Sequence, residues 1–247
     1  MITLEHIGVS YGSRRILDNL NLSVEDHCIT AVMGPNGCGK TTLLRCIGGL
    51  LSPTDGRVLL DGKPVGGYTP RELAQRVAFV HQRAQTDFEF SAFEIVLMGR
   101  NPYQRRLQNE SQADWDIVER CMRQTGTWDL RFAVPSQMSG GELQRVMIAR
   151  AMAQQTPVLL MDEPVSNLDI AHQLEVMRLL RADKEKTILI VIHDLNLALQ
   201  FCDRLLLLHD GSVQYAGPVA QGLTPENISK VYGVDAHISD GRIVFDY

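Results

Sequence analysis

Apolar and polar residues follow two patterns along this chain, and together they predict an α/β fold. Four short runs are almost continuously apolar, as the buried strands of a parallel sheet are, at residues 29–33, 77–80, 157–161 and 187–192. Segments 2–9 and 16–24 alternate loosely between apolar and polar residues, which predicts an N-terminal antiparallel β portion. Asp210-Gly211 lies between two further short strand patterns and predicts a hairpin.

Helical spacing predicts one long insertion and several separate helices. From about residue 83 to 135 apolar residues recur at three and four positions without a strand pattern, so we expect a helical insertion. Separate helices are expected from Lys40, at 143–153, at 171–181 and from Thr224 to Gly233. We expect one domain over residues 1–247, with a core at 1–83 and 156–216, a helical subdomain at 84–155 and a C-terminal element at 217–247.

The stretch 29–44 has the pattern of a strand, a glycine-rich loop and a helix N-terminus. It fits the phosphate-loop pattern G-x-x-x-x-G-K-[ST], in which glycines let backbone N–H groups turn around phosphate oxygens. The helix N-terminus points more N–H groups at the same anion. The lysine can reach the β- and γ-phosphates, and the threonine after it can hold Mg²⁺. The predicted nucleoside triphosphate site consists of Gly34, Pro35, Asn36, Gly37, Cys38, Gly39, Lys40, Thr41 and Thr42.

Two acidic residues follow the apolar run at 158–161. A buried strand that ends in carboxylates delivers them at its carboxyl-terminal edge, where α/β sheets place ligands. Asp162 can orient Mg²⁺ and its waters, and Glu163 can polarise a water for in-line attack on the γ-phosphate. Because an acidic turn after a strand is common, this interpretation depends on the phosphate loop in the same chain.

The segment SGGE has the spacing of a capping box and predicts the start of a helix. Two glycines in a first helical turn destabilise the helix by about 1 kcal/mol each, so they indicate a ligand that approaches the backbone there. The alternative is a helix start alone. A second phosphate-binding end in one chain is explained if two chains pair head to tail. The residues of this second end are Ser139, Gly140, Gly141 and Glu142.

Composition narrows the classes of protein that fit. The net charge of −5 argues against broad nucleic-acid binding, which needs a basic surface. The five cysteines form no C-x-x-C pair, so we expect a reducing cytoplasm and neither a disulfide framework nor a zinc site. No apolar run approaches the roughly 18 residues that cross a bilayer, and no secretory signal pattern is visible. If the protein serves a membrane, we expect it to do so through a partner protein.

The motifs GPNGCGKTT, SGGE and LLMDEP, followed by SNLD at 166–169, occur in the order typical of ATP-binding cassette (ABC) transporter ATPases. The chain resembles that family over nearly its whole length, which implies a P-loop NTPase fold with a RecA-like core. The resemblance implies that Tyr11 stacks on adenine and that His193 contacts the γ-phosphate. It implies that Gln82 contacts Mg²⁺ and the attacking water and links to the membrane partner.

The same resemblance implies that two of the motifs act across a dimer. Residues 139–142 would complete the site of the other protomer, and Asp169 would lie in the loop that crosses the interface. The commonest form of the signature is LSGGQ, and this chain has Met138 before the serine and Glu142 in place of the glutamine. The SGG core is retained, so only the fine role of position 142 is left open.

Two segments resemble those of metal-chelate importers. IVLMGRNPY at 95–103 resembles a segment of ATPases that serve ferric-siderophore, haem and cobalamin uptake, and 223–234 resembles their C-terminal element. The resemblance implies a homodimer at the cytoplasmic face of the inner membrane, bound to integral-membrane permease subunits and served indirectly by a substrate-binding protein. Import of a metal ion or molybdate, or a non-transport role in DNA repair or translation, is the alternative.

Overall fold

The computed structural model describes residues 1–82, 89–104 and 110–246, and the chain divides into two compact units. Unit 1 comprises residues 1–69 and 184–247, and unit 2 comprises residues 70–183. The start of the predicted helical subdomain, at residue 84, lies outside the described residues. The division into core, helical subdomain and C-terminal element therefore stays a prediction.

An antiparallel sheet forms the N-terminal part of unit 1, as predicted. Strand β1 (Ile2–Tyr11) pairs with β2 (Arg14–Val24) on one side and with β4 (Asp55–Leu60) on the other. Strand β4 also pairs antiparallel with the short β5 (Lys63–Pro64). Apolar side chains from these strands are buried, including Ile2, Leu4, Ile7 and Leu17.

The second sheet of unit 1 is mainly parallel and carries the predicted buried strands. Strand β3 (Ile29–Met33) lies between β8 (Thr187–Val191) and β9 (Arg204–His209), and it is parallel to both. Every residue of β3 and β8 is buried, which explains why their sequences are almost continuously apolar. Strand β10 (Ser212–Pro218) pairs antiparallel with β9, which confirms the predicted hairpin.

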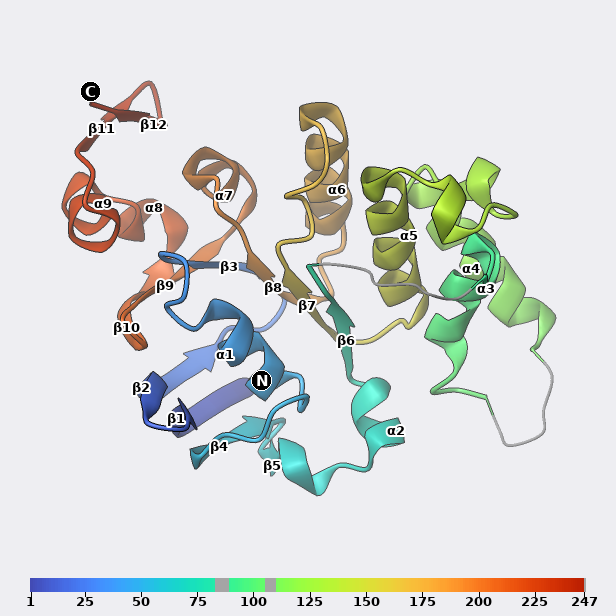
Figure 1. The fold of residues 1–247 in the computed structure, drawn as a ribbon, viewed down its shortest axis with the longest axis horizontal. Coiled ribbons are helices and arrows are strands. Elements are labelled where there is room, and N and C mark those ends of the chain that lie inside the picture. Colours follow the sequence, from blue (N-terminus) through green and yellow to red (C-terminus); the bar gives the residue numbers. More distant parts are fainter. Residues whose placement is uncertain (83–88, 105–109, 247) are drawn as a thin grey trace. The chain divides into compact units, whose positions relative to one another are not determined.

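The remaining elements of unit 1 are α1 (Lys40–Ile47), η1 (Val65–Gly67), α7 (Leu195–Phe201), α8 (Val219–Gly222), α9 (Pro225–Tyr232), β11 (Ala236–Ser239) and β12 (Arg242–Phe245). Among them, helices α8 and α9 lie together and the β11–β12 hairpin lies beyond them at the C-terminal end (Figure 1). The sequence did not predict the β11–β12 hairpin. Asn196 of α7 fixes this hairpin, since its side-chain amide exchanges hydrogen bonds of 2.8 and 3.1 Å with the backbone of Ile243.

Unit 2 contains one parallel strand pair and a group of helices. Strands β6 (Val77–Val80) and β7 (Val158–Asp162) pair in parallel. Among the described residues between them, every regular element is helical, as predicted, and α3, α4 and α5 pack together (Figure 1). The helices of unit 2 are α2 (Pro70–Ala74), α3 (Ala92–Leu97), η2 (Met98–Arg100), α4 (Gln112–Gln124), η3 (Trp128–Leu130), η4 (Pro135–Gln137), α5 (Gly140–Ala153) and α6 (Ile170–Ala182).

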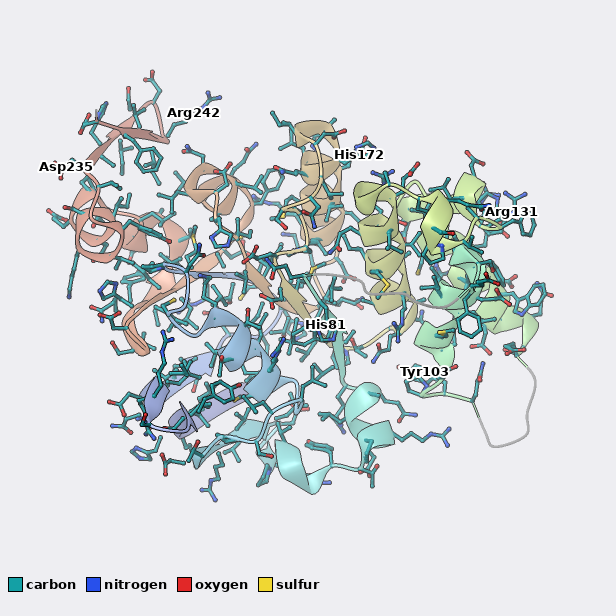
Figure 2. The ribbon with its side chains drawn as sticks, in the orientation of Figure 1. His81, Tyr103, Arg131, His172, Asp235 and Arg242 are labelled. Carbon is teal, nitrogen blue, oxygen red and sulfur yellow. The ribbon has the colours of Figure 1, made fainter. Side chains whose placement is uncertain are left out.

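The GRNPY segment joins these helices. The Arg100 guanidinium is buried; its Nε donates to Asp114 Oδ1 at 2.8 Å and its Nη1 to the carbonyl of Ala153 at 2.8 Å. Burial alone would raise the pKa of Asp114, but hydrogen bonds from Arg100 and Ser111 outweigh burial and lower the pKa below its ordinary value. Tyr103, labelled in Figure 2, stacks on the same guanidinium, 4.3 Å from Arg100 Cζ to the ring centroid.

Gly99 allows η2 to pack closely against α5. A Cβ at Gly99 would overlap the carbonyl oxygen of Arg150 in α5, so η2 approaches the backbone of α5 more closely than a side chain permits. The glycine and the arginine of this segment therefore have structural roles. In the part of the chain that the structure describes, no helix has both the length and the apolar character to cross a bilayer.

Substitution of Gly99 tests the close packing of η2 against α5. Gly99→Ala should lower the free energy of unfolding by about 1–3 kcal/mol, since the new methyl group must displace α5. Gly66→Ala is the control, because a Cβ there would meet no atom within 4 Å. The measurement is equilibrium unfolding in urea. Equal stability of the two variants would contradict the close packing at Gly99.

Candidate functional site

The predicted strand, loop and helix of the phosphate loop are present in unit 1. Strand β3 ends at Met33, residues 34–39 form the turn, and α1 begins at Lys40. Gly39 caps α1 in the left-handed region, with φ 104°. A Cβ on Gly39 would lie 2.5 Å from Leu17 Cδ2, so the loop needs glycine here for both conformation and space.

The side chain of Lys40 lies inside the loop. It is buried, and its Nζ donates to the carbonyl oxygens of Gly34 and Pro35, each at 2.8 Å. A buried ammonium group is costly unless its protons are bonded, and the two carbonyls supply that bonding. The loop therefore holds a positive charge at the start of α1.

Two more predicted residues of unit 1 occupy strand ends. Val32 of β3 pairs with Val191 of β8 in parallel, so residues that follow these strands emerge at the same edge of the sheet. The phosphate loop follows β3, and the exposed His193 follows β8. Tyr11 is the last residue of β1 and is 51% exposed, which leaves a ring surface available for stacking.

Unit 2 repeats this arrangement with its own strand pair. Val80 of β6 pairs with Met161 of β7, so the residues after them share one edge. Gln82 Nε2 donates to Glu163 Oε2 at 2.7 Å, which brings two predicted catalytic residues into contact. Asp162 is buried at the end of β7, and Glu163 has a φ of 49°, a region that non-glycine residues rarely adopt. That conformation places Glu163 at the point where the strand turns away.

The SGGE segment begins α5 with a complete capping box. Ser139 Oγ accepts from the Glu142 N–H at 3.3 Å, and the Glu142 carboxylate accepts from the Ser139 N–H and from its hydroxyl, each at 2.8 Å. These hydrogen bonds from Ser139, its backbone first, lower the pKa of Glu142. A Cβ on Gly140 would meet no atom within 4 Å, so the start of the helix is open. The predicted capping box is confirmed. Helix α5 begins at Gly140, three residues before the predicted start, because Ser139 is the N-cap and both glycines belong to the first helical turn.

Asp169 caps α6 in the same unit. Its Oδ1 accepts from the His172 N–H at 2.9 Å and lies 2.8 Å from His172 Nδ1. The backbone hydrogen bond from His172 is the main cause that lowers the pKa of Asp169. Figure 2 labels His172 on the first turn of α6. His172 is not among the residues predicted from the sequence, although its spacing of three from Asp169 at a helix start is a signal for this contact.

The predicted site residues thus fall into two groups. Unit 1 holds Tyr11, the phosphate loop and His193, whereas unit 2 holds Gln82, residues 139–142, Asp162, Glu163 and Asp169. The described residues contain no group of three or more His, Cys, Asp or Glu side chains that could hold a metal ion by itself. Thr41, Gln82 and Asp162 offer the hydroxyl, amide and carboxylate oxygens that suit Mg²⁺ when a phosphate supplies further ligands.

Known proteins share these features over most of the chain. A family model described as ABC transporter matches residues 17–166. The cobalamin import ATP-binding protein BtuD of Halobacterium salinarum is 40% identical over 245 residues, which cover 97% of this chain and 61% of that protein. The ferric enterobactin transport ATP-binding protein FepC of Escherichia coli is 36% identical over 242 residues, which cover 97% of this chain and 89% of FepC. The chain therefore spans less than two thirds of the Halobacterium protein.

A solved structure shares the fold. The dimeric structure of a post-hydrolysis state of the ATP-binding cassette MJ0796, bound to ADP and Pi, has a TM-score of 0.79 and 29% identity, and the match covers 89% of this chain and 99% of that one. The likeness confirms the predicted α/β P-loop NTPase fold with an antiparallel β portion and a helical insertion.

The capping box predicts how the pKa of Glu142 changes when the Ser139 hydroxyl is removed. Ser139→Ala should raise the pKa of Glu142 toward its ordinary value, because the hydroxyl that bonds the carboxylate is removed. Since the folded pKa of Glu142 is lowered, its contribution to stability is present above the unfolded pKa and is lost as pH falls through the folded pKa. The measurement is an NMR titration of ¹³C-labelled glutamates.

Helix α3 supplies the matched control for this titration. Ser91 and Glu94 form the same capping box, and Ser91 lowers the pKa of Glu94. Ser91→Ala should therefore raise the pKa of Glu94 and leave that of Glu142 unchanged. A Glu142 pKa that does not respond to Ser139→Ala would contradict the contribution of the Ser139 hydroxyl, since the backbone N–H is kept in this variant.

Proposed function

The chain belongs to the ABC transporter family, and we propose that it binds and hydrolyses ATP to drive uptake of a metal chelate through a membrane permease. The observation that carries this proposal is the phosphate loop, in which a buried Lys40 ammonium is held by the carbonyls of Gly34 and Pro35. Such a loop presents N–H groups and a fixed positive charge to an anion.

The residues of unit 1 bind the nucleotide. N–H groups of residues 36–42 surround the β-phosphate, and Lys40 turns from the loop carbonyls to the β- and γ-phosphate oxygens. The exposed ring of Tyr11 stacks on the adenine. His193 reaches the γ-phosphate from the end of β8, the strand beside β3.

The residues of unit 2 carry out hydrolysis. Glu163 polarises the attacking water, and its hydrogen bond with Gln82 orients the carboxylate. Thr41, Gln82 and Asp162 would hold Mg²⁺, which when bound neutralises charge on the β- and γ-phosphates. Gln82 also connects this site with the membrane partner.

A second copy of the chain completes each site. The open start of α5 at Ser139–Glu142 binds the γ-phosphate held by the partner's loop, and Asp169 lies at the interface between the two copies. Two phosphate-binding ends in one chain are explained by this head-to-tail homodimer, because each nucleotide then uses one end from each copy.

The substrate class is inferred from relatives and from two segments. Relatives that share 36–40% of their residues with this chain are named for transport of ferric enterobactin and cobalamin, and the GRNPY and C-terminal segments resemble those of metal-chelate importers. An iron-siderophore, haem or cobalamin-like chelate is therefore proposed as cargo, delivered by a substrate-binding protein. The chain acts at the cytoplasmic face of the inner membrane, without nucleic acid. Import of a metal ion or molybdate, or a role in DNA repair or translation, is the alternative.

Co-purification tests the transport role. The tagged chain is recovered from detergent-solubilised membranes of its source, and its partners are identified by mass spectrometry, with an unrelated soluble protein carrying the same tag as the control. A multi-span permease among the partners is the expected result. Recovery of only nucleic-acid or ribosomal partners would overturn the transport role and leave ATP hydrolysis standing.

Substitution of Lys40 tests the nucleotide site. Lys40→Ala should weaken ATP binding by about 10- to 100-fold, since charge-assisted hydrogen bonds to phosphate are lost. Lys63→Ala removes a lysine of the same unit that lies on the Tyr68 ring, and it should leave the affinity unchanged. Isothermal titration with Mg-ATP measures both variants. Wild-type affinity in Lys40→Ala would exclude the loop as the phosphate site.

A further inference from the structure

The start of strand β2 lies along the phosphate loop. A Cβ on Gly39 would lie 2.5 Å from Leu17 Cδ2 and 3.1 Å from the carbonyl oxygen of Ile16. A Cβ on Gly37 would lie 4.0 Å from Arg14 Nη2, and apart from the chain neighbours of Gly37 no other atom of the described residues comes within 4 Å. The guanidinium group of Arg14 is therefore the group beside the loop at the exposed Gly37.

Arg14 lies on the same face of the β1–β2 ribbon as Tyr11. The two residues are paired across the hairpin turn, and directly opposite residues of an antiparallel pair point to the same face. Leu17 shares this face, because it pairs with Val9, two residues before Tyr11 in β1. Tyr11 therefore points to the same side as Arg14 and Leu17, the two side chains that lie beside the loop.

The next residue, Arg15, belongs to the opposite face and has its own partners. Its Nε donates to Asp18 Oδ1 at 3.2 Å, and its Nη1 donates to Asp55 Oδ2 at 2.6 Å. Arg14, by contrast, makes no hydrogen bond, ion pair or ring contact with any residue that the structure describes. One arginine thus connects β2 with β4, and its neighbour leaves an uncompensated positive charge beside the phosphate loop.

An arginine with uncompensated charge at this place suits a phosphate group. A guanidinium group presents its N–H donors in a planar fork that matches two phosphate oxygens. In the proposed complex the adenine lies on Tyr11 and the phosphates lie in the loop, so the nucleotide runs past Arg14. We propose that Arg14 binds the phosphate groups of the nucleotide from outside the loop, while Lys40 binds them from inside.

This inference rests on the proposed function, because the ligand of the loop is taken to be ATP. Arg14 is exposed, so its attraction to phosphate is screened by dissolved salt more strongly than that of the buried Lys40. A contact that binds ground state and transition state equally changes KM and leaves kcat unchanged. A purely structural role of Arg14 would lower the melting temperature and would not make the affinity for ATP depend on salt.

Two substitutions separate charge from geometry. Arg14→Gln removes the positive charge, whereas Arg14→Lys keeps the charge and removes the planar fork. Arg15→Gln is the matched control, because it removes the same charge from the neighbouring residue on the opposite face. Each full-length variant is assayed for the Kd of Mg-ATP by isothermal titration at ~0.05 M and ~0.5 M NaCl, for KM and kcat, and for melting temperature.

The expected results differ between the variants. Arg14→Gln should raise Kd and KM about five- to tenfold at low salt, the effect of lost charge-assisted hydrogen bonds, with kcat within about twofold of wild type. At high salt its Kd should approach the wild-type value to within about twofold, because the wild-type contact is then screened. Arg14→Lys should raise Kd only about twofold. Arg15→Gln should lower the melting temperature and leave Kd within about twofold at both salt concentrations.

Three outcomes would overturn the inference. The first is a wild-type Kd in Arg14→Gln at low salt. The second is a Kd increase in Arg14→Gln that is equal at both salt concentrations, which would assign Arg14 a structural role. The third is an equal Kd increase in Arg15→Gln, which would mean that any lost charge in this hairpin has the effect. Failure of the proposed function is distinct, since the wild-type chain itself would then not bind Mg-ATP.

Discussion

The hydrogen bonds from the Lys40 ammonium to the carbonyls of Gly34 and Pro35 are the interaction on which the phosphate loop depends. A charge can be buried close to the end of a fully buried strand only if the backbone around it supplies acceptors. Glycines allow the loop to turn so that its carbonyl groups face the ammonium group and accept its hydrogen bonds. The packing of Leu17 against Gly39 and of Leu208 against Gly34 then ties the loop to both sheets of unit 1.

In each unit, two paired parallel strands end at the same edge of the sheet and place polar residues there. In unit 1 the strands β3 and β8 lead to the phosphate loop and His193, and in unit 2 the strands β6 and β7 lead to Gln82 and Glu163. The residues proposed to bind the nucleotide and those proposed to activate water therefore belong to different units of one chain.

Local interactions explain what could be predicted from the sequence. The phosphate loop, the capping box at Ser139 and the cap at Thr224 each depend on residues within one short, continuous stretch of the chain, so their spacing alone indicates them. The role of Gly99 depends on Arg150, which is distant in sequence, and no local pattern encodes that contact. The β11–β12 hairpin was missed because exposed residues leave its alternation weak.

We propose that one ATP is held between two copies of the chain and is hydrolysed through Glu163. The most direct test is the sedimentation mass of Glu163→Gln with Mg-ATP and with Mg-ADP. We expect twice the mass of the chain with ATP and the monomer mass with ADP, because the bound ATP cannot be hydrolysed and the dimer stays closed. A variant that stays monomeric with ATP, or that hydrolyses ATP at the wild-type rate, would contradict this claim.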